Sequence, residues 1–277
     1  WVNQGSPIEL SIGGLQIRAA SVDEAAEFYA YQYLTRSVSR NKWKGSKTSI
    51  IIVTHNQFQF TKQCVESILL RTDEPIELIF VDNASSDGTA RYLQSIAGAK
   101  VICNESNRGF PAAVNQGIEL ATGESILLLN NDTIVSTGWL ERMLNVLYSS
   151  DQIGLVGPVS NQVSGPQQIA VNYRHVNELD GFAWDWGQVN RGKVLETERL
   201  VGFCLLIKKS VLDQIGGLDE RFGVGNFEDD DLCRRARGVG YRTLIAIDSF
   251  VHHFGSVSFQ GAGYNLGQIL QENQKIY

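Results

Sequence analysis

The residues of this sequence that could most readily perform chemistry are Asn130, Asn131 and Asp132, which follow the apolar run 125–129. Such a run is typical of a strand buried on both faces, and an open α/β sheet places its ligands at the carboxyl ends of its strands. A carboxylate beside two amides offers hard oxygen ligands to Mg²⁺ or Mn²⁺. Asn and Asp also favour turns, so the triplet predicts either a divalent-metal site or a plain turn.

A second group of oxygen donors is the acidic run 228–231, which follows a glycine-rich turn at Gly223 and Gly225. The run begins a predicted helix, and the helix dipole stabilises acidic residues in a first turn, so helix capping is one interpretation. Four consecutive carboxylates exceed what a cap requires, however. Like charges packed together raise the pKa of at least one of them, which suits a general base.

Polar residues also follow the first two predicted strands: Thr54 and Asn56 come after one, and Asp82 comes after the next. A carboxylate at a strand tip can accept hydrogen bonds from a ribose or a base, and the serine-rich turn 83–89 supplies backbone donors. A capped turn without a ligand explains these residues equally well. The segment 107–117 places small residues on one helix face, which indicates close approach to a ligand or to the sheet.

Two adjacent histidines, His252 and His253, follow the last predicted strand and offer imidazole nitrogens as metal ligands. A single histidine there would more often be structural. No G-x-G-x-x-G opens a helix after the first strand, and no G-x-x-x-x-G-K-[ST] occurs in the sequence. Phosphates must therefore be bound in another way, for which a metal held by Asp132 is the natural candidate.

Composition limits the classes of function. The 277 residues carry a net charge of −6 with a pI near 5.3, which disfavours nucleic acid as a partner. No apolar stretch approaches the ~20 residues of a membrane span. No signal peptide is recognisable and the chain opens at Trp1, so we expect a piece of a longer protein with further domains. Four cysteines without a CxxC pair predict buried, reduced thiols in a cytoplasmic protein. These are Cys64, Cys103, Cys204 and Cys233.

Strands and helices alternate from residue 48 onward. This alternation predicts an α/β fold with a mostly parallel central sheet, flanked by helices and connected by right-handed crossovers. The predicted strands are 49–54, 76–81, 101–103, 125–129, 153–156, 200–207 and 243–247. The predicted helices are 58–71, 87–97, 110–121, 139–148, 210–215, 228–237 and a tail from 266. The alternation is lost over 158–198, where we predict irregular structure.

The first 47 residues have a different pattern. Alternating residues over 8–18 predict a hairpin, a capping box precedes a predicted helix over 21–33, and the basic, polar stretch 36–47 is typical of a linker. We therefore divide the chain into a small N-terminal appendage or end of a preceding domain, residues 1–47, and a larger domain, residues 48–277.

Taken in order, the motifs of the larger domain resemble those of the family 2 glycosyltransferases. They are THN after the first strand, VDNASSDGT, NRGFPAAVNQG, LLLNNDT, VGFCLLIKKSVLDQIGGLDERF, FEDDDLCRRARGVGY and HHFGS. The resemblance covers about residue 48 to the C-terminus, and several independent motifs in the right order make it specific. It implies the Rossmann-like GT-A fold and the use of a nucleotide sugar with Mn²⁺ or Mg²⁺.

The resemblance also implies roles for single residues. Asp132 matches the last carboxylate of the family's metal motif, and His253 matches a histidine near the metal and the diphosphate. Asp229, paired with Glu228, matches the catalytic base. The residues implied to bind the nucleotide sugar are Thr54, Asn56, Asp82, Asn107, Arg108, Gly109 and Asn131. Those implied to form the floor of the acceptor side are Gly202 and Phe203.

One motif departs from the family pattern, because Asn130 and Asn131 stand where Asp-x-Asp is common. With Asp132 as the one carboxylate, metal affinity should be weaker and depend on the diphosphate for further ligands. The Asn-Asn-Asp variant is similar to that of rhamnosyltransferases and other polysaccharide-building members of the family.

We therefore expect an inverting, metal-dependent glycosyltransferase, of hexosyl or rhamnosyl type, that acts in polysaccharide or glycoconjugate biosynthesis. It would move a sugar from a nucleotide-diphosphate sugar to a hydroxyl of a glycan, lipid-linked or protein-linked acceptor. A lipid-linked acceptor would bring it to the membrane surface as a peripheral protein. Asp229 would take the proton of the hydroxyl that attacks the anomeric carbon from the far face.

Two other classes of function are compatible with a ligand site at a sheet edge. A nucleotidyltransferase would normally carry a Gly/Lys/Arg-rich loop at residues 55–58, which this sequence does not have. A non-catalytic nucleotide-sugar-binding module could lose Asp132 or Asp229, and both are present.

Acceptor binding is predicted from Trp184 and Trp186 within 158–198. In an extended segment, residues two apart face the same side, and sugar rings stack well on such aromatic faces. The alternative is that the tryptophans attach the segment to the core.

Overall fold

The chain forms two compact units, residues 1–42 and 43–277. The computed structural model describes residues 8–12, 15–19, 45–255 and 266–277. In the first unit, β1 (Ile8–Ile12) and β2 (Leu15–Ala19) pair antiparallel as the sequence predicts for a hairpin.

The rest of the N-terminal segment lies outside the described residues. This applies to the predicted helix over 21–33 and to most of the predicted linker over 36–47. The domain boundary at residue 47 stays a prediction.

A mixed β-sheet forms the centre of the second unit, in the strand order β5-β4-β3-β6-β10-β8-β11-β7, with β9 paired to β11. Its first four strands are parallel, β10 is antiparallel to both neighbours, and β11 is parallel to β8 but antiparallel to β7 and β9. The predicted α/β fold class is confirmed. The strand bounds are β3 (Thr48–Thr54), β4 (Ile76–Asp82), β5 (Lys100–Cys103), β6 (Ser125–Leu129), β7 (Thr133–Val135), β8 (Ile153–Val159), β9 (Val194–Glu196), β10 (Cys204–Lys208) and β11 (Arg242–His253).

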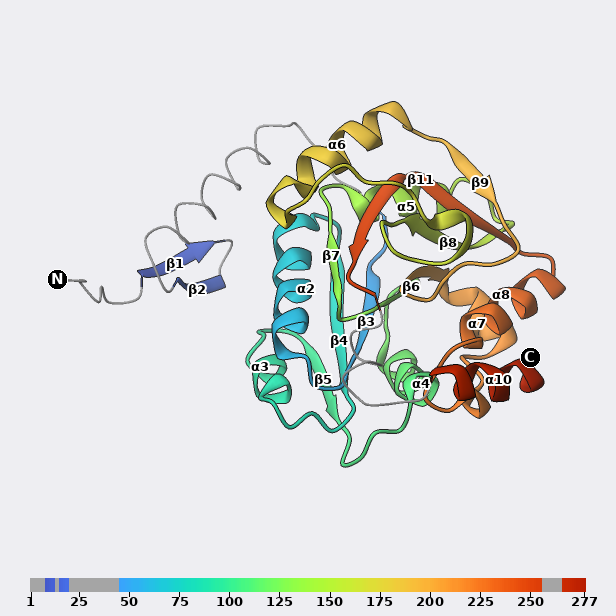
Figure 1. Ribbon diagram of the computed structural model, residues 1–277, viewed down its shortest axis with the longest axis horizontal. Helices are drawn as coiled ribbons and strands as arrows, with labels where there is room; N and C mark the ends of the chain where they lie inside the picture. Colours follow the sequence, from blue (N-terminus) through green and yellow to red (C-terminus); the bar gives the residue numbers. More distant parts are fainter. Residues whose placement is uncertain (1–7, 13–14, 20–44, 256–265) are drawn as a thin grey trace. The chain divides into compact units, whose positions relative to one another are not determined.

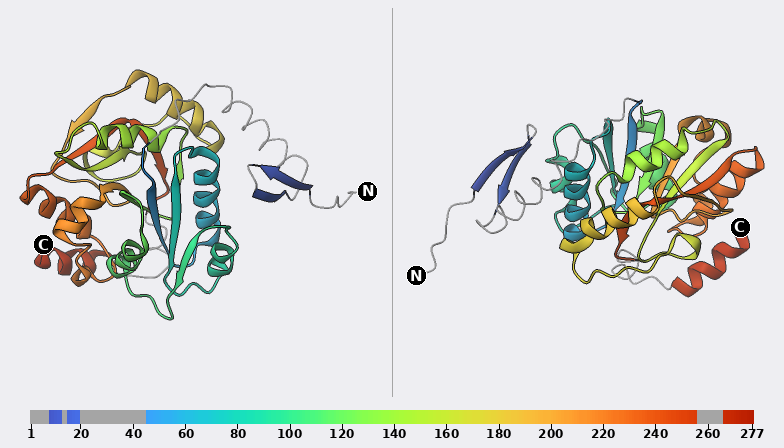
Figure 2. Two further views of the ribbon diagram at one scale, coloured as in Figure 1. Left: turned by 180° about the vertical axis from the view of Figure 1, so that it is seen from behind. Right: turned by 90° about the horizontal axis from the view of Figure 1, so that it is seen from above.

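Helices cover both faces of this sheet (Figures 1 and 2). The core on one face includes side chains of α2, α3 and α5, and the core on the other includes side chains of α4, α6, α7 and α8. The helix bounds are α2 (Phe58–Arg71), α3 (Thr89–Gln94), α4 (Phe110–Leu120), α5 (Trp139–Leu147), α6 (Leu179–Val189), α7 (Lys209–Ile215), α8 (Glu228–Gly238) and α10 (Leu266–Ile276). Short 3₁₀ turns occur at Gly165–Gln167, Val176–Glu178 and Glu220–Phe222.

The strand β3 shows why its apolar run forms a central strand. Ile50 and Ile52 belong to the core on the α2 and α5 face, and Ile51 between them belongs to the core on the α4 face. Burying each such side chain contributes about 1.5–3 kcal/mol, so both faces of the strand must be covered. The small residue Gly117 lets α4 approach closely, because a Cβ there would lie 2.5 Å from Ile51 Cγ2.

The prediction of irregular structure over 158–198 is right for most of residues 160–178, where two short 3₁₀ turns are the only helical elements described. It is wrong for residues 179–189, which form the helix α6, and α6 packs against β11. The residues Leu179, Phe182, Ala183 and Trp186 have the i, i+3, i+4, i+7 spacing of a buried helix face, and all four contact the core. This pattern was present in the sequence.

The extended conformation predicted for the two tryptophans is also wrong, because both lie on α6. Two residues apart on a helix point about 200° apart, so the rings face different sides. Trp186 donates through Nε1 to the carbonyl oxygen of Ile247 at 2.6 Å and stacks on Phe182. The ring of Trp184 is 43% exposed. Trp186 therefore attaches the segment to the core, as the alternative interpretation held.

Three strands differ clearly in extent from their predictions. β8 continues to Val159, beyond the predicted end at residue 156. β10 begins at Cys204 rather than at residue 200, so the stretch before it is a loop. β11 runs to His253, beyond the predicted end at residue 247, because a shift of register between Ala246 and Phe250 lets it continue and pair with β7. The short strand β7 was not predicted. The pairing of β11 with β7 decides where His253 lies.

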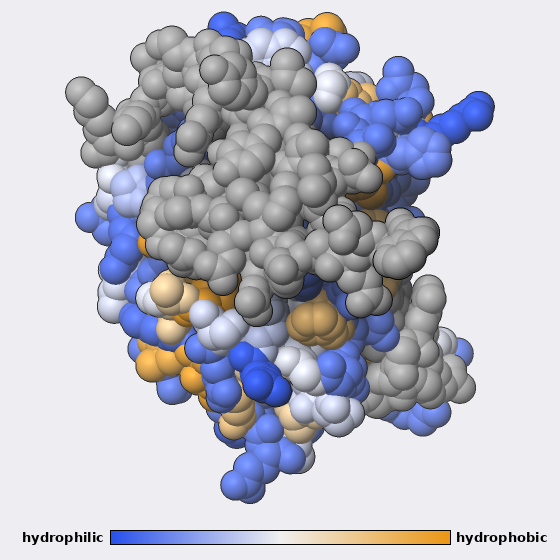
Figure 3. Space-filling view, turned by 90° about the vertical axis from the view of Figure 1, so that its left-hand side faces the viewer, coloured by the Kyte–Doolittle hydropathy of each residue, from blue (hydrophilic) through white to orange (hydrophobic). Residues whose placement is uncertain are grey.

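The described surface in Figure 3 is mostly hydrophilic, with hydrophobic residues in small separate patches. None of the described helices is both long and apolar enough to span a bilayer. Three of the four free cysteines are buried as predicted, whereas Cys103 is exposed.

Candidate active site

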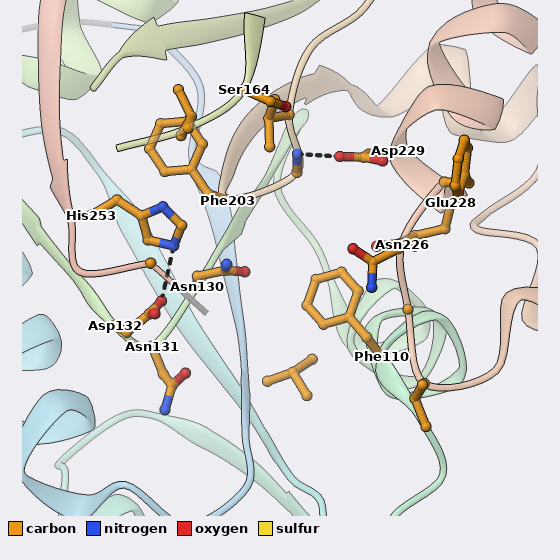
Figure 4. Close-up of a pocket in the computed structure, with 18 of the residues that line it drawn as sticks. Phe110, Asn130, Asn131, Asp132, Ser164, Phe203, Asn226, Glu228, Asp229 and His253 are labelled. Carbon is orange, nitrogen blue, oxygen red and sulfur yellow. Dashed lines mark hydrogen bonds and ion pairs between the residues drawn. The ribbon is translucent and has the colours of Figure 1, made fainter. Parts of the chain in front are cut away.

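A cavity of about 600 Å³ opens at the carboxyl ends of β3, β4 and β6 (Figure 4). Polar and charged side chains from separate parts of the chain line it. They include Asn83, Asn107, Asn130, Asp132, Arg199, Glu228, Asp229, Asp230 and His253. Among the predicted residues Thr54, Asn131, Gly202 and Phe203 also line the cavity, whereas Trp184 and Trp186 do not.

The side chains of Thr54 and Asp82 join the ends of β3 and β4. Thr54 Oγ1 donates to Asp82 Oδ1 at 2.9 Å, and the backbone N–H of Ser85 donates to Asp82 Oδ2 at 2.9 Å. Both side chains are almost fully buried. Asp82 thus shapes the turn after β4, and its predicted contact with a nucleoside stays a prediction.

Asn56 connects the turns after β3 and β4. Its N–H donates to Ser85 Oγ at 2.7 Å, and its Oδ1 accepts from the N–H of Ser86 at 2.8 Å. Asn56 adopts a left-handed backbone conformation with φ 57°, which Asn tolerates better than most residues. In this structure Asn56 positions two loops, and it is not among the residues that line the cavity.

The segment of Asn107, Arg108 and Gly109 is held by Asn83, a residue not among the predicted site residues. Asn83 Nδ2 donates to the carbonyl oxygen of Gly109 at 3.2 Å, and its Oδ1 accepts from the side chain of Asn104 at 2.8 Å. Asn107 lines the cavity, whereas the side chain of Arg108 is exposed. The position of Asn83 directly after β4 was the available signal in the sequence.

Gly109 touches a distant loop through its backbone. Its φ is 82°, and a Cβ there would lie 2.0 Å from the carbonyl oxygen of Gly223. That loop leads into α8, where the acidic run begins. Only glycine allows both the conformation and the contact.

Asp132 and His253 meet on one side of the cavity, with His253 Nε2 3.3 Å from Asp132 Oδ1. The pairing of β11 with β7 places them together, because His253 lies opposite Thr133. His253 Nδ1 lies 2.8 Å from the carbonyl oxygen of Gln162, and a carbonyl only accepts hydrogen bonds, so Nδ1 carries the proton. The ring also stacks on Phe203 with centroids 5.1 Å apart. Both contacts fix the ring with the Nε2 lone pair toward the carboxylate.

These two side chains fit a metal ion. His253 Nε2 is buried without a hydrogen-bond partner, and metal-binding histidines are commonly oriented by a carbonyl on the other nitrogen. Adjacent ligands of an octahedral Mg²⁺ at about 2.1 Å would be about 3 Å apart, close to the spacing of Asp132 Oδ1 and His253 Nε2. Among the described residues, no cluster of three or more His, Cys, Asp or Glu side chains could hold a metal ion.

The other members of the two motifs have structural contacts. Asn131 Nδ2 donates to Thr61 Oγ1 of α2 at 2.9 Å, so its amide points away from the cavity centre (Figure 4). Its predicted role in nucleotide-sugar binding stays a prediction. His252 faces the opposite side of β11, where its ring nitrogen lies 2.5 Å from Tyr173 Oη and burial lowers its pKa to about 4. The prediction that both histidines are ligands is therefore wrong for His252.

Asp229 lies in the first turn of α8, on the same cavity. Its Oδ2 accepts from the N–H of Gly202 at 2.7 Å, and its Oδ1 accepts from the N–H of Asp230 at 2.9 Å. Burial and the charge of Asp230 raise the pKa of Asp229 above its ordinary value, and the hydrogen bonds and Arg199 partly offset this. Gly202 approaches Asp229 closely: a Cβ there would lie 3.2 Å from Asp229 Cβ, so a side chain at this position would require Asp229 to shift by a few tenths of an ångström.

The four acids of the run have different surroundings. Glu228 is buried, and burial followed by the charges of Asp229 and Asp230 raises its pKa well above the ordinary value. Asp230 forms an ion pair with Arg199, with Nε 2.5 Å from Oδ1. Asp231 pairs with Arg234 and Arg235 on its own helix. Glu228, Asp229 and Asp230 all line the cavity and all have a raised pKa. Asp229 differs in that each of its carboxylate oxygens accepts a hydrogen bond from a backbone N–H.

Known proteins are similar to this chain in sequence and in fold. The sequence model described as Glycosyl transferase family 2 matches residues 49–216. The chain is 26% identical to the N-acetylglucosaminyl-diphospho-decaprenol L-rhamnosyltransferase of Mycobacterium tuberculosis, over 74% of this chain and 75% of that protein. It is 28% identical to the uncharacterized glycosyltransferase YwdF of Bacillus subtilis, over 83% of this chain and 81% of that protein. Against another relative, the uncharacterized protein y4gI of Sinorhizobium fredii, it is 28% identical but spans only 24% of that protein's length.

Solved structures share the fold. The structure of GalNAc-T7 with UDP, GalNAc and Mn²⁺ superposes with a TM-score of 0.61 and 17% identity, covering 76% of this chain and 44% of that one. The mannosyltransferase PcManGT of Pyrobaculum calidifontis, in complex with GDP-Man and Mn²⁺, gives a TM-score of 0.57 and 19% identity, covering 83% of this chain and 66% of that one.

Proposed function

Since the chain belongs to glycosyl transferase family 2 and is a glycosyltransferase of the GT-A fold, we propose that it is a metal-dependent enzyme that inverts the configuration of the transferred sugar. Its donor would be a nucleotide-diphosphate sugar. Its acceptor would be a hydroxyl of a glycan, a lipid-linked or a protein-linked molecule.

The observation that carries this proposal is the position of two groups on one cavity. Asp132 and His253 lie on one side, and Asp229 lies on the other (Figure 4). The donor's diphosphate would lie at the first group, and the acceptor hydroxyl at the second. The anomeric carbon would then lie between them, with the leaving group and the attacking oxygen on opposite faces of the sugar. That arrangement supports a single displacement with inversion.

Asp229 would take the proton of the acceptor hydroxyl as it attacks. Its raised pKa makes the ionised carboxylate a stronger base than an exposed aspartate. The N–H groups of Gly202 and Asp230 hold both of its oxygens, so the remaining lone pairs have a fixed direction. Burial raises the pKa of Glu228 beside it well above the ordinary value, which favours its neutral form and keeps a second negative charge away from the base.

Asp132 and His253 would hold Mn²⁺ or Mg²⁺, which when bound supplies positive charge to the departing diphosphate. Among the described residues that line the cavity, Arg199 is the one Arg or Lys, and its guanidinium pairs with Asp230. The Mn²⁺ in the structures of GalNAc-T7 and PcManGT supports this part of the proposal. Thr54, Asn83 and Asn107 line the part of the cavity proposed for the nucleoside.

The relatives support a role in polysaccharide or glycoconjugate biosynthesis, with a hexosyl or rhamnosyl donor. The relative from M. tuberculosis is named for transfer of L-rhamnose to a diphospho-decaprenol-linked sugar. A lipid-linked acceptor of this kind would place the present protein at a membrane surface as a peripheral protein.

The test is a panel of UDP-, GDP- and dTDP-sugars, each incubated with Mn²⁺ or Mg²⁺ and with chelator. We expect metal-dependent release of nucleotide diphosphate from one donor. The Asp229→Asn variant should bind that donor but release the nucleotide diphosphate from it much more slowly. NMR of the transferred sugar, in its new glycosidic bond to the acceptor, should show the anomeric configuration opposite to that in the donor. Retention of configuration would contradict the mechanism, and tight donor binding without turnover under any condition would indicate a binding module instead.

A further inference from the structure

The helix α10 contacts the loop before α8 through one buried side chain, that of Asn273. Its Nδ2 donates to the carbonyl oxygens of Phe222, Gly225 and Asn226 at 3.0, 2.9 and 3.0 Å. An amide nitrogen has two hydrogens, so one of them is shared between two carbonyls. Asn273 is 5% exposed, whereas the neighbouring Gln274 is exposed. Asn273 is therefore a polar side chain on the side of α10 that faces the protein, where it makes a specific contact.

The loop that Asn273 holds has an unusual backbone. Three consecutive residues, Gly225, Asn226 and Phe227, have positive φ values of 125°, 77° and 75°. Left-handed conformations cost a residue other than glycine roughly 1–2 kcal/mol, and they persist where surrounding contacts enforce them. Phe227 is the N-cap of α8, so this conformation sets the direction in which the helix starts.

The loop is bounded on its other side as well. The backbone of Gly109 lies against the carbonyl oxygen of Gly223, so the loop cannot move toward α4 without a clash. Beyond the loop, the ring of Tyr277 lies 5.6 Å from that of Phe227 and under the guanidinium of Arg234. The loop is thus held between the Gly109 segment and α10.

We infer that Asn273 is a positioning residue for Asp229. The inference rests on the proposed role of Asp229 as the base. Asn273 acts through the loop: its three hydrogen bonds fix the backbone at residues 222–226, Phe227 starts α8, and Asp229 lies two residues further on. The side chain of Leu270, also on α10, lines the cavity. Docking of α10 therefore completes the site on the side where the acceptor would bind.

A pair of matched substitutions tests this inference. Asn273→Asp removes the two N–H donors with little change of shape, and Gln274→Glu makes the same change of charge on the exposed face. Because a misplacement of about 1 Å can cost a catalytic group roughly 10²-fold, we expect kcat to fall by roughly 10- to 100-fold in Asn273→Asp. The donor KM should change much less than kcat, since the three hydrogen bonds of Asn273 go to the loop before α8 and reach the nucleoside side only through the Gly109 contact. Gln274→Glu should retain the wild-type kcat.

Two results would overturn the inference. One is a kcat of Asn273→Asp within about twofold of wild type. The other is a parallel loss of kcat, donor binding and melting temperature, which would show that Asn273 only stabilises the fold.

Hydrogen exchange gives a readout that does not require turnover. The amides of residues 222–231 should exchange faster in Asn273→Asp than in wild type or Gln274→Glu, while those of β3 and β4 should be unchanged. If the wild-type protein transferred no sugar, the proposed function would fail but this comparison would still decide whether Asn273 holds the loop. Equal exchange over residues 222–231 in all three proteins would refute the contact's role.

Discussion

The ion pair of Asp230 and Arg199 should set the pH at which Asp229 becomes active. Asp229 works as a base only when ionised, so the rate should fall as the pH drops through its pKa. The charged groups that affect this carboxylate are Glu228 and Asp230 on α8 and Arg199 from the segment before β10. In the wild type the ion pair is nearly neutral. Asp230→Asn leaves one positive charge beside the base, and Arg199→Gln leaves one negative charge.

The size of the effect follows from Coulomb's law. Unit charges 4–8 Å apart interact by about 2–4 kcal/mol at an effective dielectric constant near 20, which is about 1.5–3 pH units without screening. The side chain of Arg199 is 48% exposed, so solvent and salt reduce the interaction. We expect the pKa of Asp229 to shift by about 0.5–1 pH unit, downward in Asp230→Asn and upward in Arg199→Gln.

The assay is the acidic limb of the pH profile of kcat/KM, measured at constant ionic strength with the donor identified by screening. Arg237→Gln serves as the control, because Arg237 pairs with Glu198 in an exposed ion pair and should leave the limb unmoved. A change in kcat/KM at every pH does not by itself test the prediction, which concerns the position of the acidic limb. Arg199 lines the cavity, so its substitution can also alter substrate binding directly. Shifts of the same sign in Asp230→Asn and Arg199→Gln, or no shift in either, would refute the prediction.

Three further substitutions probe other parts of the site. Asp229→Asn should lower kcat by about 10²–10⁴-fold while calorimetry shows donor binding near that of wild type; transfer at the wild-type rate would exclude this residue as the base. Asp132→Ala should remove the gain in nucleotide-diphosphate affinity that Mn²⁺ gives; tight metal binding without nucleotide, unchanged by the substitution, would contradict the proposed site. Gly109→Ala should lower the free energy of unfolding in urea by about 2–5 kcal/mol, because its Cβ would clash with Gly223. Gly98→Ala, with a similar φ but open space, should cost only about 1 kcal/mol, and equal losses would argue against the clash.

The parallel half of the sheet could be predicted from the sequence within a residue or two at its strands. The strand at 48–54 is buried on both faces, so its β-branched run has no competing periodicity, and the helices between strands carry clear apolar faces. The position of Asp132 at the end of β6 followed from the same rule. These features are local, and the sequence encodes them locally.

The remaining differences depend on contacts that are distant in sequence. The continuation of β11 to His253 requires a register shift and the partner strand β7, and neither has a pattern of its own. The contact of Asn273 with the loop before α8 joins residues about fifty apart in sequence. The helix α6 is a different case, because its apolar spacing from Leu179 onward is local and predicts a helix.

The contact of Gly109 with Gly223 has a consequence for the order of substrate binding. Backbone touches backbone there, with no flexible side chain to absorb a displacement. A nucleotide that tightens the Gly109 segment would therefore also stabilise the loop on the acceptor side. Donor and acceptor should then bind cooperatively, and thermodynamic reciprocity requires that each raise the affinity of the other by the same factor. Titrating the acceptor with and without bound nucleotide diphosphate would measure that factor, and a value of one would show that the two halves of the cavity act independently.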